Sequence, residues 1–181
     1  MKILLHCCCA PCSVASIDSL LADGHDVKTY FYNPNIHPYK EYIARRNSWL
    51  NYMAAKNCDY LIDDEYPLEE WLQSVAQNPG QRCKYCYGVR LDHAAAKAKA
   101  LKFEAFSTTL SISPYQNHEL IKKAGAEAGA KYGVAFYYAD LRSSYRAGQA
   151  AAKEAGLYMQ KYCGCIYSEK IRYYKKKELE S

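Results

Sequence analysis

The chain has 181 residues, of which 50% are hydrophobic in type and 24% are charged, and it includes 19 Tyr and 9 Cys. This length excludes a mini-protein that depends on disulfides, and we expect a single α/β domain over residues 1–181 with a basic C-terminal tail. The net charge of +5 permits an anionic partner such as RNA but does not require one.

The sequence predicts no membrane partner. No run of residues approaches the roughly 18 apolar positions that a membrane span needs, and the apolar stretch 2–6 reaches Cys7 too soon for a secretory segment. We therefore expect a cytoplasmic protein. Thiols stay reduced in that compartment, so nine cysteines favour metal ligation or redox chemistry over structural disulfides.

Strand and helix patterns alternate along the chain. Short apolar or β-branched runs predict strands at 2–6, 27–32, 60–62, 105–110 and 134–138. Helical spacing predicts helices at 14–22, 39–56, 67–76, 86–101, 119–132 and 142–155, and the stretch after Tyr162 is predicted to be less regular. This alternation predicts a doubly wound, Rossmann-like and HUP-like α/β domain, in which a largely parallel five-stranded sheet carries helices on both faces. Ligands of such sheets bind beyond the carboxyl ends of the strands.

The loop after the first predicted strand carries four of the nine cysteines, Cys7, Cys8, Cys9 and Cys12. A nucleotide-binding loop at this place would contain glycines, and this one has none. The positive end of the next helix favours the thiolate form that metals require. A single buried cysteine is usually a small hydrophobic residue, but four within six positions predict a chemical role.

A second cysteine pair, Cys83 and Cys86, has the two-residue spacing that grips a metal ion or two corners of an iron-sulfur cluster. With two thiols from the first loop it provides four soft ligands, which suit either zinc or a 4Fe-4S cluster. A domain of this size folds without a metal, so we rank structural zinc below a 4Fe-4S cluster.

A third pair, Cys163 and Cys165, is separated only by Gly164. A disulfide in so small a ring is strained and labile, which suits an electron relay, and the alternative is that both thiols are further metal ligands. Asp140 follows the fifth predicted strand, where it can act as an acid or an oxygen ligand, or instead cap the next helix.

Several motifs together resemble the QueH-type epoxyqueuosine reductases, in order and over nearly the whole chain. They are His6 to Ser13, Tyr32-Asn33-Pro34-Asn35-Ile36-His37-Pro38, Arg82-Cys83-Lys84-Tyr85-Cys86-Tyr87 with Arg90-Leu91, Asp140-Leu141-Arg142, and Gln160 to Ser168. The resemblance implies removal of the epoxide oxygen from epoxyqueuosine in tRNA, the last step of queuosine synthesis, with iron-sulfur chemistry. Converting an epoxide to an alkene and water takes two electrons and two protons.

The resemblance also implies residue roles. Cys8, Cys9, Cys83 and Cys86 would hold a 4Fe-4S cluster, and Cys163 with Cys165 would form a redox-active pair. Cys12 matches the family motif and is a candidate ligand of one additional iron ion, with Asp140 or a tyrosine as proton donor. Cys7 is an additional cysteine that the family motif does not contain.

The implied partners are tRNA and an unidentified electron donor. Basic residues interleaved with Tyr173 and Tyr174 can neutralise phosphates and stack on bases, namely Lys170, Arg172, Lys175, Lys176 and Lys177. A solvated terminal face is the other interpretation of this run. The alternative functions are a non-catalytic zinc-binding RNA module and a metal-independent thiol-based transferase or reductase.

Overall fold

A computed structural model describes residues 1–174. Its centre is one sheet of five parallel strands in the order β3-β2-β1-β4-β5. The strands are β1 (Lys2–His6), β2 (Asp26–Phe31), β3 (Tyr60–Ile62), β4 (Ala105–Thr108) and β5 (Ala135–Phe136). The predicted doubly wound fold with its five-stranded parallel sheet is confirmed.

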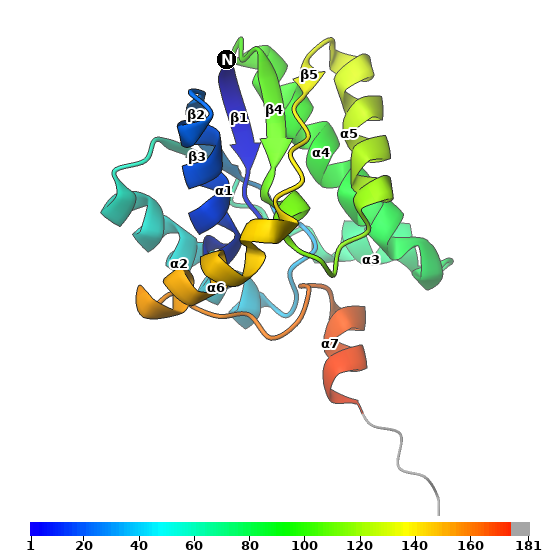
Figure 1. Cartoon of the computed structure of the whole chain (residues 1–181). Helices are drawn as coiled ribbons and strands as arrows, with labels where there is room; N and C mark the ends of the chain where they lie inside the picture. Colours follow the sequence, from blue (N-terminus) through cyan, green and yellow to red (C-terminus); the bar gives the residue numbers. More distant parts are fainter. Residues whose placement is uncertain (175–181) are drawn as a thin grey trace, which may run out of the picture.

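Helices cover both faces of this sheet (Figure 1). One face is covered by α1 (Ala10–Ala22) and α2 (Tyr39–Lys56), with α6 (Tyr145–Glu154) packed on α1. The other face is covered by α4 (Arg82–Ala100) and α5 (His118–Tyr132). The chain changes face between β3 and β4, so β1 and β4 are the neighbours at which the winding direction reverses. Ligands of open α/β sheets bind at that point.

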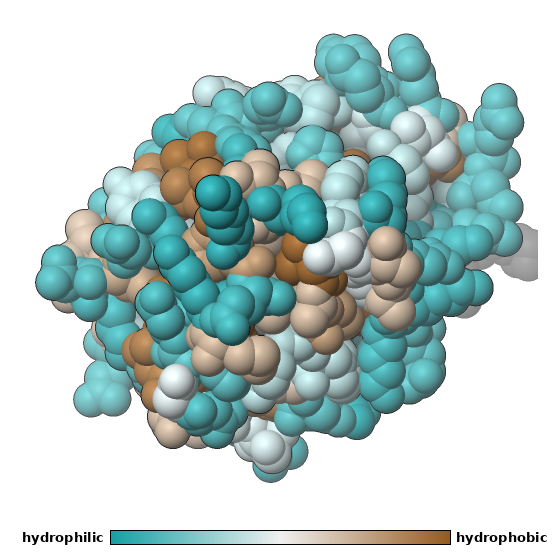
Figure 2. All heavy atoms as spheres, turned by 90° about the horizontal axis from the view of Figure 1, so that it is seen from above, coloured by the Kyte–Doolittle hydropathy of each residue, from teal (hydrophilic) through white to brown (hydrophobic). Residues whose placement is uncertain are grey.

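The two layers of core come from alternate side chains of the same strands, as expected for strands buried on both faces. Leu4 and Phe106 pack toward α4 and α5, whereas Ile3, Leu5 and Phe31 pack toward α1 and α2. Seen from the amino ends of the strands, the surface is mainly hydrophilic with small, interrupted hydrophobic patches (Figure 2). Within residues 1–174, no helix has the length and apolar character needed to cross a membrane.

Two helical glycines form a matched pair for a stability prediction. A Cβ on Gly129 of α5 would lie 2.8 Å from the carbonyl oxygen of Val134, whereas a Cβ on Gly88 of α4 would meet nothing within 4 Å. We expect Gly129→Ala to lower the free energy of unfolding by about 1–3 kcal/mol through overpacking. Gly88→Ala is expected to raise it by about 0.5–1 kcal/mol through helix propensity. Urea unfolding measures both changes, and equal effects would contradict the close approach of α5 to the chain before β5.

Two helices begin earlier than predicted. Helix α1 starts at Ala10 rather than at position 14, because Pro11 in its first turn presets a helical φ before the apolar periodicity begins. Helix α4 starts at Arg82 rather than at Cys86, because a short 3-10 turn over Pro79–Gln81 leads directly into it. Cys12 and Cys83 are therefore held on helices and not on loops.

Other boundaries also differ from the prediction. Strand β4 ends at Thr108, whose hydroxyl accepts a hydrogen bond from the Leu110 amide and starts the 3-10 turn Thr109–Ile112. Strand β5 keeps only two residues, and α6 begins after a 3-10 turn at Arg142–Ser144. The remaining helices are α3 (Leu68–Ala76) and α7 (Ile166–Tyr173).

Helix α7 lies in the stretch that we predicted to be less regular, and that prediction was wrong. Glu, Lys and Arg favour a helix there, and Tyr167 packs against Trp71 of α3. Of the predicted basic tail, Lys170 and Arg172 lie on α7, whereas Lys175, Lys176 and Lys177 lie outside the described residues.

Candidate metal and redox site

A cleft of about 470 Å³ lies beyond the carboxyl ends of β1 and β4. Six cysteines line it: Cys8, Cys9, Cys12, Cys83, Cys163 and Cys165. Cys86 lies behind them, in a small cavity that it shares with Cys83, Cys163 and Cys165. Three segments that are far apart in sequence therefore contribute cysteines to one cleft and to the small cavity behind it. That thiols of the first two segments bind the same metal group stays a prediction.

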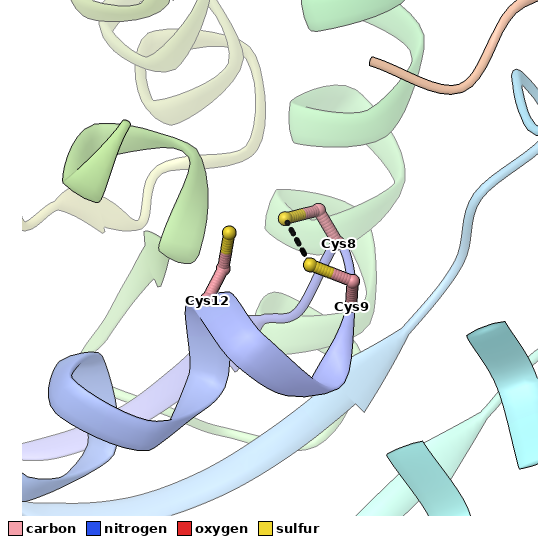
Figure 3. A group of neighbouring side chains, drawn as sticks. All are labelled: Cys8, Cys9 and Cys12. Carbon is pink, nitrogen blue, oxygen red and sulfur yellow. Dashed lines mark hydrogen bonds between the residues drawn. The ribbon is translucent and has the colours of Figure 1, made fainter. Parts of the chain in front are cut away.

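The tightest group is Cys8, Cys9 and Cys12, whose sulfur atoms all lie within 4.8 Å of one another. Their side chains converge from the loop after β1 and the first turn of α1 (Figure 3). The Sγ atoms of Cys8 and Cys9 are 3.6 Å apart. Thr109, which follows β4, fixes this loop by accepting a hydrogen bond from the Cys8 amide at 3.0 Å and donating one to Cys8 Sγ at 3.3 Å. The trio thus sits at the β1–β4 reversal point.

The three thiols have unequal acidities. Hydrogen bonds from Cys12 and Cys9 lower the pKa of the Cys8 thiol well below its ordinary value. Burial raises the pKa of Cys9. The pKa of Cys12 is also raised, and the largest cause is the hydrogen bond between Cys12 and Cys8. A thiol with a lowered pKa beside two further thiols is the arrangement expected of a soft-metal site, because the thiolate is the form that ligates.

The pair on α4 is separate from this trio in the structure. Within residues 1–174, Cys8, Cys9 and Cys12 form the only group of three or more candidate ligands that all lie within 4.8 Å. Cys86 is buried and Cys83 is exposed, and burial is the main cause that raises the pKa of both thiols, that of Cys86 to about 12. Arg90, one turn further along α4, donates to Cys86 Sγ at 3.2 Å.

Cys163 and Cys165 carry free thiols in this structure. Cys163 is exposed at the cleft, whereas Cys165 is buried against Trp71 and Val75 of α3. The buried guanidinium of Arg45 holds this segment, since it donates to the carbonyl oxygens of Cys163 at 3.0 Å and Tyr162 at 2.9 Å. Their role as a redox pair stays a prediction.

Asp140 lies apart from the cysteines. It is exposed, is not among the residues that line the cleft, and binds Arg142 through both carboxylate oxygens, at 2.8 and 2.5 Å. These bonds lower its pKa to about 2. Its Oδ1 also accepts from the Arg142 amide at 3.3 Å, but the N-cap of the 3-10 turn is Leu141 and that of α6 is Ser144, so Asp140 is the N-cap of neither. The proton-donor role of Asp140 stays a prediction.

The two histidines of the motifs are buried. His6 bonds to the Thr108 hydroxyl at 2.9 Å and the Tyr32 carbonyl at 3.1 Å, so it joins three strand ends and has a structural role. His37 packs edge-on against Trp71, and within the described residues neither ring nitrogen has a hydrogen-bond partner. Burial lowers the pKa of both histidines to about 4, so both rings are neutral near pH 7.

The sequence analysis assigned Arg45, Arg90 and Gln160 no role at the cysteines. Gln160 Nε2 donates to Cys9 Sγ at 2.8 Å, while its Oε1 is buried without a partner among the described residues. Arg90 belongs to the motif that contains Cys83 and Cys86. Residues four positions apart are neighbours on a helix, so this spacing could have indicated the contact between Arg90 and Cys86. Arg45 carried no local signal, because its partners lie more than a hundred positions away.

The fold and this cleft together define a doubly wound α/β protein with a thiol-rich site for a soft metal or for redox chemistry. The model of the epoxyqueuosine reductase QueH family matches residues 3–171. A curated epoxyqueuosine reductase QueH of Dehalococcoides mccartyi is 40% identical over 95% of this chain and 94% of its own length. Another, from Acinetobacter baylyi, is 36% identical over 92% of this chain and 80% of its own length. This chain belongs to the epoxyqueuosine reductase QueH family.

A similar solved structure supports the fold. The predicted subunit of a tRNA methyltransferase from Methanocaldococcus jannaschii aligns with a TM-score of 0.54 at 12% identity, over 85% of this chain and 76% of that one. At this identity the likeness concerns only the α/β architecture.

Proposed function

We propose that this chain is an epoxyqueuosine reductase, an oxidoreductase that converts epoxyqueuosine in tRNA to queuosine as the last step of queuosine synthesis. The observation that carries the proposal is the convergence of cysteines from three distant segments around one cleft, in a member of this family. The reaction removes the epoxide oxygen as water, taking up two electrons and two protons. We infer a cytoplasmic location, where these thiols stay reduced.

The donor set fits an iron-sulfur cluster. Sulfur is the ligand that such clusters prefer, and the described residues that line the cleft include six cysteines but no His, Asp or Glu. We propose Cys8, Cys9, Cys83 and Cys86 as the ligands of a 4Fe-4S cluster and Cys12 as a ligand of one additional iron. When bound, the cluster would supply electrons one at a time from an external donor, and the iron would supply Lewis-acid assistance.

The residues around the cysteines fit the binding of a polar group. Arg82 Nε and Gln160 Oε1 line the cleft, and both are buried without a hydrogen-bond partner among the described residues. Unsatisfied buried polar atoms are costly, so a site that carries two of them is suited to a ligand that pairs with them. We propose that they orient the modified base beside the cysteines.

Tyrosines are the proton donors that the cleft itself contains. Tyr145 lies at the start of α6 and packs edge-on against Tyr115, which is 83% exposed at the mouth of the cleft. Burial raises the pKa of Tyr145, so its hydroxyl stays protonated near neutral pH and can donate to a developing oxyanion. Cys163 and Cys165 also line the cleft, and we propose that they relay electrons by reversible disulfide formation.

The charge of the cleft fits an RNA substrate. Among the described residues that line it, none is acidic, and Arg45, Arg82, Arg90, Lys161 and Arg172 are basic. Exposed cations around a pocket attract a phosphate backbone while a base enters the pocket. We propose that tRNA lies across this rim with the modified base directed toward the cysteines.

This RNA placement predicts the effect of removing two exposed basic residues. The double variant Lys161→Ala and Arg172→Ala is expected to bind tRNA more weakly. The slope of log affinity against log salt is expected to fall by about one for each phosphate that the variant no longer neutralises. Filter binding at several salt concentrations measures both. The double variant Arg146→Ala and Lys153→Ala, at exposed positions of α6 outside the cleft lining, is the charge-matched control, and an equal weakening in that variant contradicts the placement.

The activity is tested directly with iron-loaded protein, epoxyqueuosine-containing tRNA and a low-potential reductant. Nucleoside mass analysis is expected to show the loss of one oxygen atom. Anaerobically purified protein is expected to be brown from the cluster, whereas a colourless protein with bound zinc supports the non-catalytic RNA module. Turnover by metal-free protein supports the thiol-based transferase or reductase.

A further inference from the structure

Arg90 is a buried cation between the cysteine groups. It lies on α4 and is only 2% exposed, and it lines both the cleft and the small cavity behind it. Its Nε donates to the carbonyl oxygen of Cys86 at 2.9 Å, and its Nη2 donates to Cys86 Sγ at 3.2 Å. Burial acts to lower the pKa of its guanidinium, whereas Cys86, Cys163, Cys8 and Tyr87 act to raise it, and the net shift is upward.

The chain provides no carboxylate for this cation. None of the ion pairs within residues 1–174 includes Arg90. The other buried arginine, Arg45, is 3% exposed and pairs with Glu41 at 2.7 Å. A buried charge is strongly destabilising unless an opposite charge compensates it. The two arginines therefore differ in one respect: the partner of Arg45 is a side chain, whereas the anionic partner of Arg90 has to come from the sulfur site.

We propose that Arg90 is the built-in counter-cation of the anionic metal–thiolate group in the cleft, and that it raises the reduction potential of that group. The inference rests on the proposed function, because it requires that the cysteines hold an iron-sulfur cluster. A cluster gains one negative charge when it takes one electron from the external donor. A fixed cation and an N–H···S bond stabilise the more negative reduced form over the oxidised form.

Arg90 is a positioning residue in this scheme, acting through Cys86 and not on the substrate. The planar guanidinium donates to both the carbonyl oxygen and the sulfur of Cys86, which fixes the orientation of the Cys86 side chain. A purely structural role, such as the hydrogen bond from Nε to the Cys86 carbonyl oxygen, requires a donor on the side chain but not its charge. The charge therefore distinguishes the two roles.

The test compares Arg90→Gln, Arg90→Lys and the unaltered protein, each loaded with iron and sulfide. We expect Arg90→Gln to lower the ratio of reduced to oxidised cluster at a fixed solution potential by at least tenfold, which is about 59 mV for one electron. Arg90→Lys keeps the charge and is expected to recover most of that shift. Arg146→Gln removes an equal charge from an exposed position of α6 outside the cleft lining, and is expected to leave the potential unchanged. Potentiometric titration followed by electron paramagnetic resonance gives the values.

Unfolding of the iron-free proteins provides a second readout. Without the cluster the buried charge of Arg90 is poorly compensated, so we expect iron-free Arg90→Gln to melt no lower than the unaltered protein, and the loaded variant to melt lower than its loaded counterpart. A structural role predicts lower melting in both forms.

The outcomes separate the two proposals. If all variants hold a cluster with the same potential, or if Arg90→Gln melts lower in both forms without a shift in potential, the role of Arg90 is overturned and the reductase proposal stands. If the unaltered protein binds no iron-sulfur cluster under any loading condition, the proposed function and this inference both fail.

Discussion

Replacing Cys83 by serine is expected to abolish both cluster binding and turnover. Cys83 stands at the first turn of α4 with its thiol at the cleft, and in the proposed ligand set it holds one corner of the cluster. Altering a residue that merely supports a metal ligand costs about 10–100-fold in metal affinity or activity, and loss of a ligand itself is expected to exceed that range. Iron content per chain and the rate of queuosine formation in tRNA are the two measurements.

Two other cysteines make this experiment selective. Cys58 precedes β3 and lies outside the cleft lining, so Cys58→Ser is expected to keep full iron content and turnover. Cys12→Ser tests the compact trio that the structure brings together. If Cys12→Ser loses the cluster while Cys83→Ser keeps it, the ligand set is the trio of the first loop, and the four-cysteine assignment is wrong.

Replacing Arg45 by methionine is expected to lower the free energy of unfolding by about 3–5 kcal/mol, the range measured when one partner of a buried ion pair is removed. The guanidinium has 2% side-chain exposure and pairs with Glu41, and it also satisfies the carbonyl oxygens of Tyr162 and Cys163. The substitution leaves all three acceptors without this donor. Urea unfolding gives the total effect, and hydrogen exchange after Tyr162 is expected to increase because the segment loses its attachment to α2.

A double variant separates the ion pair from the attachment of the segment. Adding Glu41→Gln to Arg45→Met removes the uncompensated carboxylate, so we expect part of the missing stability to return while hydrogen exchange near Cys163 stays fast. Full recovery of both quantities contradicts a role for Arg45 in holding the Cys163 segment. An unchanged unfolding free energy in the single variant contradicts the buried ion pair itself.

The architecture was predictable because its signals are local. The strands β1 and β3 and the helix α2 have the predicted boundaries, since an apolar run or a helical period is complete within each segment. Parallel pairing and the two covered faces followed from their alternation. Boundaries failed where a proline or a short 3-10 turn extended a helix beyond its apolar period, as at Pro11 and Pro79.

The candidate site was predictable in its residue types but not in its grouping. Cysteine spacing indicated that the thiols act together, and the sheet-edge rule placed the first loop and α4 near each other. The close approach of Cys12 to Cys8 and Cys9 depends on where α1 begins, which the apolar pattern does not report. The interactions of Arg45 and Arg90 depend on which faces of α2 and α4 meet the cleft, and such long-range packing has no signal in a single sequence.

The cleft draws its walls from the loop after β1, the start of α4 and the segment 160–172. During synthesis the last of these segments leaves the ribosome long after the first. A growing chain therefore contains Cys8, Cys9, Cys12 and the cysteine pair of α4 before the segment 160–172 has completed the cleft. We therefore expect metal loading to follow release of the chain, once Arg45 holds the segment that contains Cys163 in place.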